Sequence, residues 1–190
     1  RLNGRKKFIE YFFERTIKKK ILLSFMMVCM SIFAFRILNV SAEKYADTPL
    51  HYEVSNGEIT ITYCDEMATG EIVIPNTIEG YPVTSIGFSV FGGCDRLTSV
   101  TIPDSVVGIS EGAFFNPSTS GCSSLTSINV DVNNNNYCSD NGILYNKAKT
   151  KIICYPSGKA GTNFTIPNSV TSIGRYAFFE CGNVNKWSQS

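Results

Sequence analysis

The sequence predicts an α/β-solenoid, a right-handed coil of short strands and short helical or 3₁₀ turns. The first observation is a repeat, because an Ile-Pro pair followed by a polar turn occurs at 74–75, 102–103 and 166–167. The second is its spacing, since 28 residues separate Ile74 from Ile102 and again Ile102 from Val130. The third is that one such unit cannot cover its own apolar face, which stacked neighbours would cover. We expect an N-terminal β-hairpin cap and one inserted β-hairpin in addition.

The first 42 residues differ in charge from the rest of the chain. They carry nine Lys and Arg against two Glu, whereas residues 43–190 carry eight Lys and Arg against fourteen Asp and Glu. Residues 1–20 are a basic extension that ends in three lysines. Residues 21–42 begin with the apolar run ILLSFMMVCMSIFA and end in the small residues VSA, an arrangement typical of a secretory signal peptide. We therefore expect a secreted or cell-surface protein that is cleaved after Ala42.

Two other interpretations of this segment are open. An uncleaved membrane anchor is the first, but the apolar run is shorter than the roughly 20 residues that cross a bilayer, and Arg36 interrupts its extension. A basic arm for nucleic acid is the second, but lysines directly before an apolar run more often direct membrane insertion. Because residues 43–190 carry a net charge of −6, they would repel phosphate. We expect no nucleic-acid partner, and membrane contact only through the signal segment.

Residues 43–70 predict an N-terminal β cap. Asn56-Gly57 is a hairpin turn signal between the segments HYEVS and EITITYC. Ile59, Ile61 and Tyr63 alternate with other residues as in a half-buried strand. Such a hairpin would shield the first coil.

Residues 71–190 hold the repeats, and we expect the last repeat to be truncated at the C-terminus. In LTSVTI, Val100 and Ile102 alternate with hydroxyl residues as in a strand, which the following proline ends because it lacks an amide donor. The segments EGAFF and RYAFF are compatible with one helical or 3₁₀ turn, which would place the alanine and first phenylalanine of each against the core. Behind each Ile-Pro pair an isoleucine, a phenylalanine and a cysteine recur: Ile86, Phe91 and Cys94; Ile109, Phe114 and Cys122; Ile173, Phe178 and Cys181.

The 36-residue step from Val130 to Ile166 predicts the insertion. GILY and KIICY are short apolar strands joined by the turn-forming NKAKT, so residues 142–145 would pair with residues 151–155 as a β-hairpin. The polar stretch DVNNNNYCSDNG before it is explained as a turn-rich connection. Calcium binding there is a weaker alternative, because the stretch lacks the acidic spacing and terminal Glu of an EF-hand loop.

Six cysteines remain after cleavage: Cys64, Cys94, Cys122, Cys138, Cys154 and Cys181. An exported chain with an even number of cysteines can carry disulfides. Because Cys94, Cys122 and Cys181 occupy one repeat position, buried structural thiols are the favoured interpretation and disulfides the alternative. No C-x-x-C pair supports a zinc site.

We expect no catalytic residues. The single histidine, His51, has no cysteine or serine motif nearby, and the acidic residues after position 42 are scattered apart from Asp65-Glu66, so they suggest no carboxylate pair of a glycosidase. The glycines at 92, 93 and in SGKAG are interpreted as turn residues, because no helix-opening Lys-Ser/Thr pattern of a phosphate loop follows. The prediction is a protein that is not an enzyme, with no catalytic, cofactor-binding or metal-binding residue and no cofactor.

The repeat LTSVTIPDSV…GISEGAF…GCSSLTSINV, followed by NNNNYCSDNGILYNKAKTKIICYPSGKAGTNFTIPNSVTSIGRYAFFEC, resembles the BspA-like, or treponemal-type, leucine-rich repeats. The resemblance covers residues 71–181 and includes the inserted element. Extra residues at 79–83 and 116–120 depart from the family pattern, and we expect them to bulge from the coil. The resemblance implies a leucine-rich-repeat coil and a bacterial or protist surface protein that adheres to matrix proteins such as fibronectin and fibrinogen, or to other cells.

A solenoid without catalytic residues is best interpreted as a recognition module. Hydroxyl and aromatic side chains expected on its surface, Thr98, Thr101, Thr126 and Tyr176, suit polar contact with protein or glycan ligands. We therefore predict a non-catalytic adhesion module that binds such ligands on host matrix or cells. The alternatives are the repeat or targeting region of a larger exported enzyme, and a structural surface-layer repeat.

Overall fold

The computed structural model describes residues 43–46, 48–117, 121–161, 163–182, 184 and 186–189. The chain divides into two compact units, Arg1–Ser41 and Ala42–Ser190, and every described residue belongs to the second. The basic extension and the signal segment therefore lie outside the described residues. Within the part that is described, no helix is long and apolar enough to cross a membrane.

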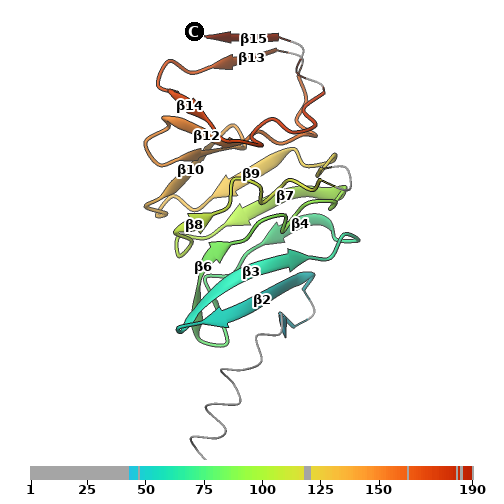
Figure 1. Ribbon diagram of the computed structural model, residues 1–190, viewed down its shortest axis with the longest axis vertical. Helices are drawn as coiled ribbons and strands as arrows, with labels where there is room; N and C mark the ends of the chain where they lie inside the picture. Colours follow the sequence, from blue (N-terminus) through green and yellow to red (C-terminus); the bar gives the residue numbers. More distant parts are fainter. Residues whose placement is uncertain are drawn as a thin grey trace, which may run out of the picture. The chain divides into compact units, whose positions relative to one another are not determined.

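Short strands stacked one above another build the described unit (Figure 1). A parallel sheet runs through successive coils and consists of β4 (Thr69–Val73), β7 (Arg96–Ile102) and β9 (Ser127–Val130). Its register follows the sequence repeat, because Ile72 lies beside Val100 and Val100 beside Ile128. Each of these steps is 28 residues, so the sequence spacing equals one turn of the coil. The predicted solenoid is confirmed.

A second sheet begins at the N-terminal end of the described unit. In order it contains β1 (Glu43–Lys44), β2 (Leu50–Ser55), β3 (Glu58–Cys64), β6 (Tyr81–Ile86) and β5 (Thr77–Ile78), and β8 (Gly108–Ile109) also pairs with β6. β2 and β3 form the predicted hairpin, with φ of 53° at Asn56 and 79° at Gly57, as a type I′ turn requires. Because β3 pairs in parallel with β6, and β6 with β8, the hairpin covers the first coil.

One residue of this cap departs from the expected alternation. The pairing of β2 with β3 shifts by one residue at Thr62, which is a β-bulge. Because a bulge reverses the side to which the following residues point, Cys64 is buried and Tyr63 is 41% exposed. Ile59 and Ile61, which precede the bulge, are buried as predicted. The assignment of Tyr63 to the inner face is wrong for this reason.

The extra residues at 79–83 contain the turn between β5 and β6. Glu79 and Gly80 form this turn, with φ of 51° and 83°. The chain thus accommodates the additional residues in a short hairpin whose second strand, β6, belongs to the coil. The second extra segment, at 116–120, lies only partly within the described residues.

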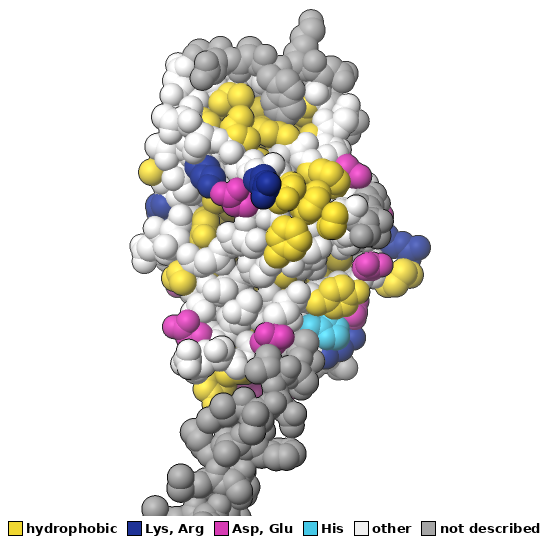
Figure 2. Space-filling model, in the orientation of Figure 1, with side chains coloured by type: hydrophobic (Ala, Val, Ile, Leu, Met, Phe, Trp, Pro, Cys, Tyr) yellow, Lys and Arg dark blue, Asp and Glu magenta, His cyan; other side chains and the backbone are white. Residues whose placement is uncertain are grey.

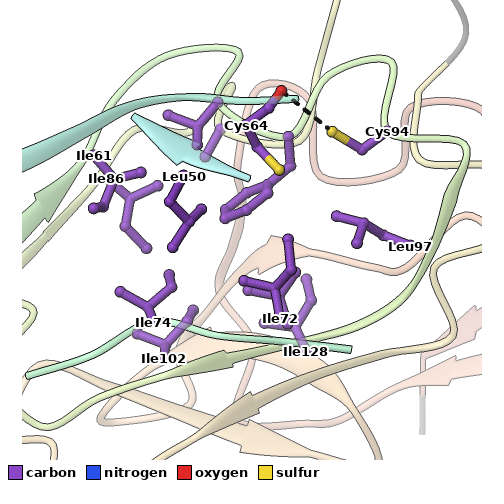
Figure 3. Close-up of a cluster of buried hydrophobic side chains, with 14 of the residues drawn as sticks. Leu50, Ile61, Cys64, Ile72, Ile74, Ile86, Cys94, Leu97, Ile102 and Ile128 are labelled. Carbon is purple, nitrogen blue, oxygen red and sulfur yellow. Dashed lines mark hydrogen bonds between the residues drawn. The ribbon is translucent and has the colours of Figure 1, made fainter. Parts of the chain in front are cut away.

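Side chains from both sheets fill one hydrophobic core (Figure 3). Ile61 and Ile86 come from the second sheet, and Ile72 and Ile128 come from the parallel sheet. All four are buried, and burying an aliphatic side chain of this size contributes about 1.5–3 kcal/mol. Stacking of the coils therefore covers the apolar face that a single repeat leaves open.

The segments EGAFF and RYAFF form tight turns. The amide of Ala113 donates to the carbonyl of Ser110 (3.0 Å) and the amide of Ala177 to that of Gly174 (3.1 Å), which are 3₁₀-type contacts. Ala113 and Ala177 are buried, and the half-buried phenylalanine after each packs against a core cluster, as expected. No helix occurs among the described residues, so the helical elements of the coil are reduced to these single turns.

The insertion forms a three-stranded antiparallel meander. Its strands are β10 (Tyr137–Asp140), β11 (Ile143–Asn146) and β12 (Lys151–Cys154), and β12 pairs in parallel with β14 (Ser172–Ile173). The hairpin of β11 and β12 is the predicted one. β10 lies in the stretch expected to be an irregular connection, and this expectation is wrong. The signal was present in the sequence, because Asn141-Gly142 is a type I′ hairpin dipeptide and both residues have positive φ.

A buried asparagine ties the insertion to the preceding coil. The Nδ2 of Asn134 donates to the carbonyls of Pro103 (2.7 Å) and Val106 (3.0 Å). Its Oδ1 accepts the amides of Asn136 (2.9 Å) and Tyr137 (2.8 Å). Asn134 is fully buried, so these four hydrogen bonds satisfy the side chain without water.

The last described strands continue the coil past the insertion. β13 (Asn163–Ile166) ends before a proline, as β7 does, and pairs in parallel with β15 (Lys186–Gln189). Ile173 of β14 is 49% exposed, although its repeat position predicts an inward side chain. The reason is its place at a sheet edge, because no strand among the described residues pairs with the other side of β14.

The six cysteines after position 42 are free thiols, and all except Cys138 are buried. At the repeat position, each Sγ lies next to a carbonyl oxygen of an earlier segment of the coil. These contacts join Cys94 to Cys64 (3.7 Å; Figure 3), Cys122 to Phe91 (2.7 Å) and Cys181 to Tyr155 (3.4 Å). Burial raises the pKa of Cys181 to about 12, so this thiol stays protonated at neutral pH. The favoured interpretation as buried structural thiols agrees with this environment.

Candidate functional site

Aromatic side chains from three turns meet on the surface of the described unit. Phe88 belongs to the turn at 88–93, Phe115 follows the turn at 111–114, and Tyr176 and Phe179 belong to the turn at 175–180. We call these four residues the aromatic cluster. Phe88 is 53% exposed and the other three are half-buried, so part of the cluster faces solvent.

The rings of the aromatic cluster contact one another in defined geometries. Phe115 and Tyr176 are stacked, with centroids 3.9 Å apart and planes 13° apart, and Phe115 meets Phe179 edge-on at 4.6 Å. Phe88 lies edge-on to Phe115 at 5.9 Å and to Tyr176 at 6.2 Å. Such pairs contribute roughly 0.5–1.5 kcal/mol each beyond their burial. The cluster is therefore a packed unit and not a set of independent side chains.

Backbone hydrogen bonds fix the turns that carry these rings. The amide of Ser89 donates to the carbonyl of Gly112 (2.8 Å), and the amide of Phe91 donates to the carbonyl of Ala113 (2.8 Å). The third turn is held by a side chain, because Glu111 Oε2 accepts the amide of Arg175 (2.9 Å). The rings consequently project from a preorganised backbone.

Gly112 allows Phe88 to lie against the neighbouring turn. A Cβ at this position would stand 2.2 Å from Cε2 and 2.6 Å from Cδ2 of Phe88, far inside van der Waals contact. Any other residue at 112 would therefore displace the Phe88 ring. The aromatic cluster therefore requires glycine at this position, although its φ is not positive.

A small charged group flanks the aromatic cluster. Glu111 Oε1 is paired with Lys151 Nζ, and Oε2 accepts the Arg175 amide. The Arg175 guanidinium lies 5.7 Å from the centroid of the Tyr176 ring, within cation–π distance. The contact with Lys151 lowers the pKa of Glu111 most, and the hydrogen bond from the Arg175 amide lowers it further, so this pKa lies below its usual range. Two cations thus stand beside one carboxylate.

The Glu111 carboxyl provides a direct test of this geometry. Its pKa in the full chain is expected to lie below the usual value of about 4.3, and Lys151→Ala is expected to raise it, measured by NMR titration of the Glu111 side-chain carbon. The pKa of Glu111 is lower in the folded state than in the unfolded chain, so above pH about 4.3 the ionised carboxylate stabilises the fold. This stabilisation is lost as the pH falls through the pKa of the folded state.

Lys159→Ala is the matched control for this titration. Lys159 Nζ donates to the carbonyl of Asn141 and makes no contact with Glu111. An equal shift of the Glu111 pKa in both variants, or no shift in either, would contradict the assigned ion pair.

Figure 2 shows hydrophobic side chains gathered on one face of the described unit, next to an acidic group that lies between two basic groups. This is the kind of surface that the aromatic cluster and its flanking charges form. Isolated apolar residues on a surface are ordinary, whereas contiguous ones mark interaction sites. The aromatic cluster is accordingly the candidate binding site.

The structure keeps the three threonines predicted to contact ligands together on the parallel sheet and separates Tyr176 from them. Thr98 and Thr101 lie on β7, and Thr126 directly precedes β9. Two of their hydroxyls are used within the sheet, because Thr126 Oγ1 donates to the Thr98 carbonyl (3.0 Å) and Thr101 Oγ1 to Glu71 Oε1 (3.3 Å). Tyr176 lies in the aromatic cluster instead.

Sequence reasoning missed the other three members of the cluster. Phe88, Phe115 and Phe179 were not distinguished from core residues, because a phenylalanine in an apolar segment is most often buried. The usable signal is the pair in EGAFF and RYAFF. When Ala113 and Ala177 point inward, the second phenylalanine of each pair is left near the surface.

The single histidine lies beside an aspartate on the N-terminal cap. His51 Nε2 lies 3.1 Å from Asp65 Oδ1, and Lys44 Nζ lies 2.9 Å from Asp65 Oδ2. The contact with Lys44 lowers the pKa of Asp65 most, and the hydrogen bond with His51 lowers it further, so this pKa lies below its usual range. Across the described ranges, no three His, Cys, Asp or Glu side chains are grouped as a metal site would require.

The repeats match a known protein family. The family model of the BspA type leucine rich repeat region matches residues 62–158 and 154–188, in six copies. No curated protein matches the chain.

Several solved leucine-rich-repeat structures are similar to the chain. One from Eubacterium ventriosum is 21% identical, with a TM-score of 0.49, and the match covers 76% of this chain and 58% of that one. One from Bacteroides capillosus is 23% identical, with a TM-score of 0.43, and covers 80% and 99%. A leucine rich cell surface protein from Faecalibacterium prausnitzii is 16% identical, with a TM-score of 0.36, and covers 78% and 76%. The chain thus spans 58% of the length of the Eubacterium protein.

Proposed function

Because the chain belongs to the BspA-type leucine-rich repeat family, we propose that it is a secreted or cell-surface adhesion module, non-catalytic, that binds matrix proteins or other cells. Fibronectin and fibrinogen are the first ligands to test, since the resemblance of the repeats implies them. The signal-like segment that ends at Ala42 supports export.

The observation that carries this proposal is the aromatic cluster. It is exposed in part, it is fixed by hydrogen-bonded turns, and it stands on stacked coils whose buried side chains form two hydrophobic core clusters. Binding sites that are rigid before association lose less conformational entropy when the partner binds. A solenoid that presents such a surface suits recognition.

Adhesion is tested with the full chain, produced in a bacterial host that exports it. The purified protein is expected to bind immobilised fibronectin or fibrinogen, epithelial cells or bacterial cells more strongly than a chain with a scrambled repeat region. N-terminal sequencing of the same preparation is expected to begin at Glu43. Binding no better than the scrambled chain on every one of these surfaces would overturn the proposal.

A further inference from the structure

The aromatic cluster has a charge character that differs from the rest of the described unit. Lys151 and Arg175 stand beside one carboxylate, Glu111, whereas residues 43–190 as a whole carry a net charge of −6. The surface beside Tyr176 is therefore locally positive on an acidic protein. A partner that matches it presents negative charge at this place.

The individual contacts show which cation is available to a partner. Lys151 Nζ is already paired with Glu111. The Arg175 side chain is exposed, and within the described part of the chain no carboxylate forms a salt bridge with it; its guanidinium lies over the Tyr176 ring. An arginine held on an aromatic face can still donate two parallel hydrogen bonds to a carboxylate.

The carboxylate of Glu180, next to the Phe179 ring, limits how a partner can lie on the aromatic cluster. Glu180 follows Phe179, and its Oε2 accepts the amide of Gly121 (2.6 Å). A carboxylate of the partner is therefore favoured beside Arg175 and disfavoured beside Phe179. The rings between these two charges have no polar atoms except the Tyr176 hydroxyl, so an apolar side chain fits there.

From these contacts we propose that the aromatic cluster is the binding hot spot for a protein segment that carries an apolar or aromatic side chain next to a carboxylate. Phe88 and its neighbouring rings receive the apolar side chain, and Arg175 receives the carboxylate. In binding hot spots, a buried aromatic anchor and an arginine are surrounded by residues that contribute little binding energy but exclude water. This assignment rests on the proposed recognition function and names the chemical class of its partner.

The experiment uses the full chain and a phage-displayed library of random 12-residue peptides. Peptides enriched on the chain are expected to contain Phe, Tyr, Trp or Leu beside Asp or Glu. Phe88→Ala and Arg175→Glu are each expected to raise the Kd of an enriched peptide at least about tenfold. The same two variants are measured on whichever matrix protein or cell the unmodified chain binds.

Matched controls are available for both changes. Val107→Ala alters a side chain that is 54% exposed in the connection between β7 and β8, where the Val107 amide donates to the Thr84 carbonyl (2.8 Å). Arg96→Glu makes the same charge reversal on β7. Both controls are expected to bind the peptide within about twofold of the unmodified chain.

The outcomes separate this inference from the proposed function. Adhesion that survives Phe88→Ala and Arg175→Glu would overturn the hot spot and leave the adhesion function in place. Peptide binding lost in both variants, without adhesion to any matrix or cell, would support the hot spot and reject the adhesion function. Absence of enriched aromatic-acidic peptides would overturn the assignment, as would Phe88-dependent binding to immobilised glycans alone.

Discussion

Replacing Phe91 with alanine is expected to lower the free energy of unfolding by about 3–5 kcal/mol. The Phe91 side chain is fully buried and stacks on Phe114, with ring centroids 5.1 Å apart. The backbone around it is fixed, because its amide donates to Ala113 and its carbonyl accepts the Cys122 thiol. The surrounding coils cannot collapse into the space that alanine leaves. Urea unfolding of the full chain, followed by circular dichroism, measures the change.

Phe88→Ala is the matched control for this prediction. Phe88 lies three residues before Phe91 in the same turn but is 53% exposed. Its loss is expected to cost about 1–3 kcal/mol, because Phe88 makes two edge-on ring contacts of roughly 0.5–1.5 kcal/mol each. Equal losses in the two variants would show that the Phe91 side chain does not support the core as described.

Changing Asn134 to aspartate is expected to destabilise the protein by at least about 3 kcal/mol at neutral pH. The replacement keeps the size of the side chain but removes the amino group that donates to the carbonyls of Pro103 and Val106. It also buries a charge where two carbonyl oxygens face it. Desolvation would raise the pKa of the new carboxyl above its unfolded value of about 3.9. The folded state then binds more protons, so the variant should regain stability as the pH falls.

Asn133→Asp tests whether the effect comes from the buried hydrogen bonds. Asn133 is the preceding residue and is exposed, so its replacement adds the same charge without burying it. We expect a change within about 0.5 kcal/mol, as for most surface substitutions. A loss for Asn134→Asp no larger than that for Asn133→Asp, or one that grows on acidification, would contradict the prediction.

The repeat could be found from the sequence because the physics behind it is local and periodic. Alternating apolar residues such as Val100 and Ile102 define the inner face of a strand, and a proline ends it. The equal 28-residue steps then reappear as hydrogen-bonded neighbours in the parallel sheet. Asn56-Gly57 identified its hairpin for the same reason, since the dipeptide itself favours the turn conformation.

Tyr63 and Ile173 could not be placed in this way. The inner or outer position of Tyr63 depends on a bulge at Thr62, which arises from pairing with β2. Exposure of Ile173 depends on which strands flank β14. Both properties belong to neighbours in space, which a repeat pattern does not specify.

The amino-acid sequence by itself determined the coil, its register, most of the core and the predicted hairpins, because each follows from side-chain periodicity or turn chemistry within a short segment. Only the tertiary structure decided the aromatic cluster and its charges. Glu111 contacts Arg175 across 64 residues of sequence and Lys151, which belongs to the insertion, across 40. Such contacts form when the meander folds back onto the coil and brings separate turns together. Their geometry is set by packing, and no local pattern encodes it.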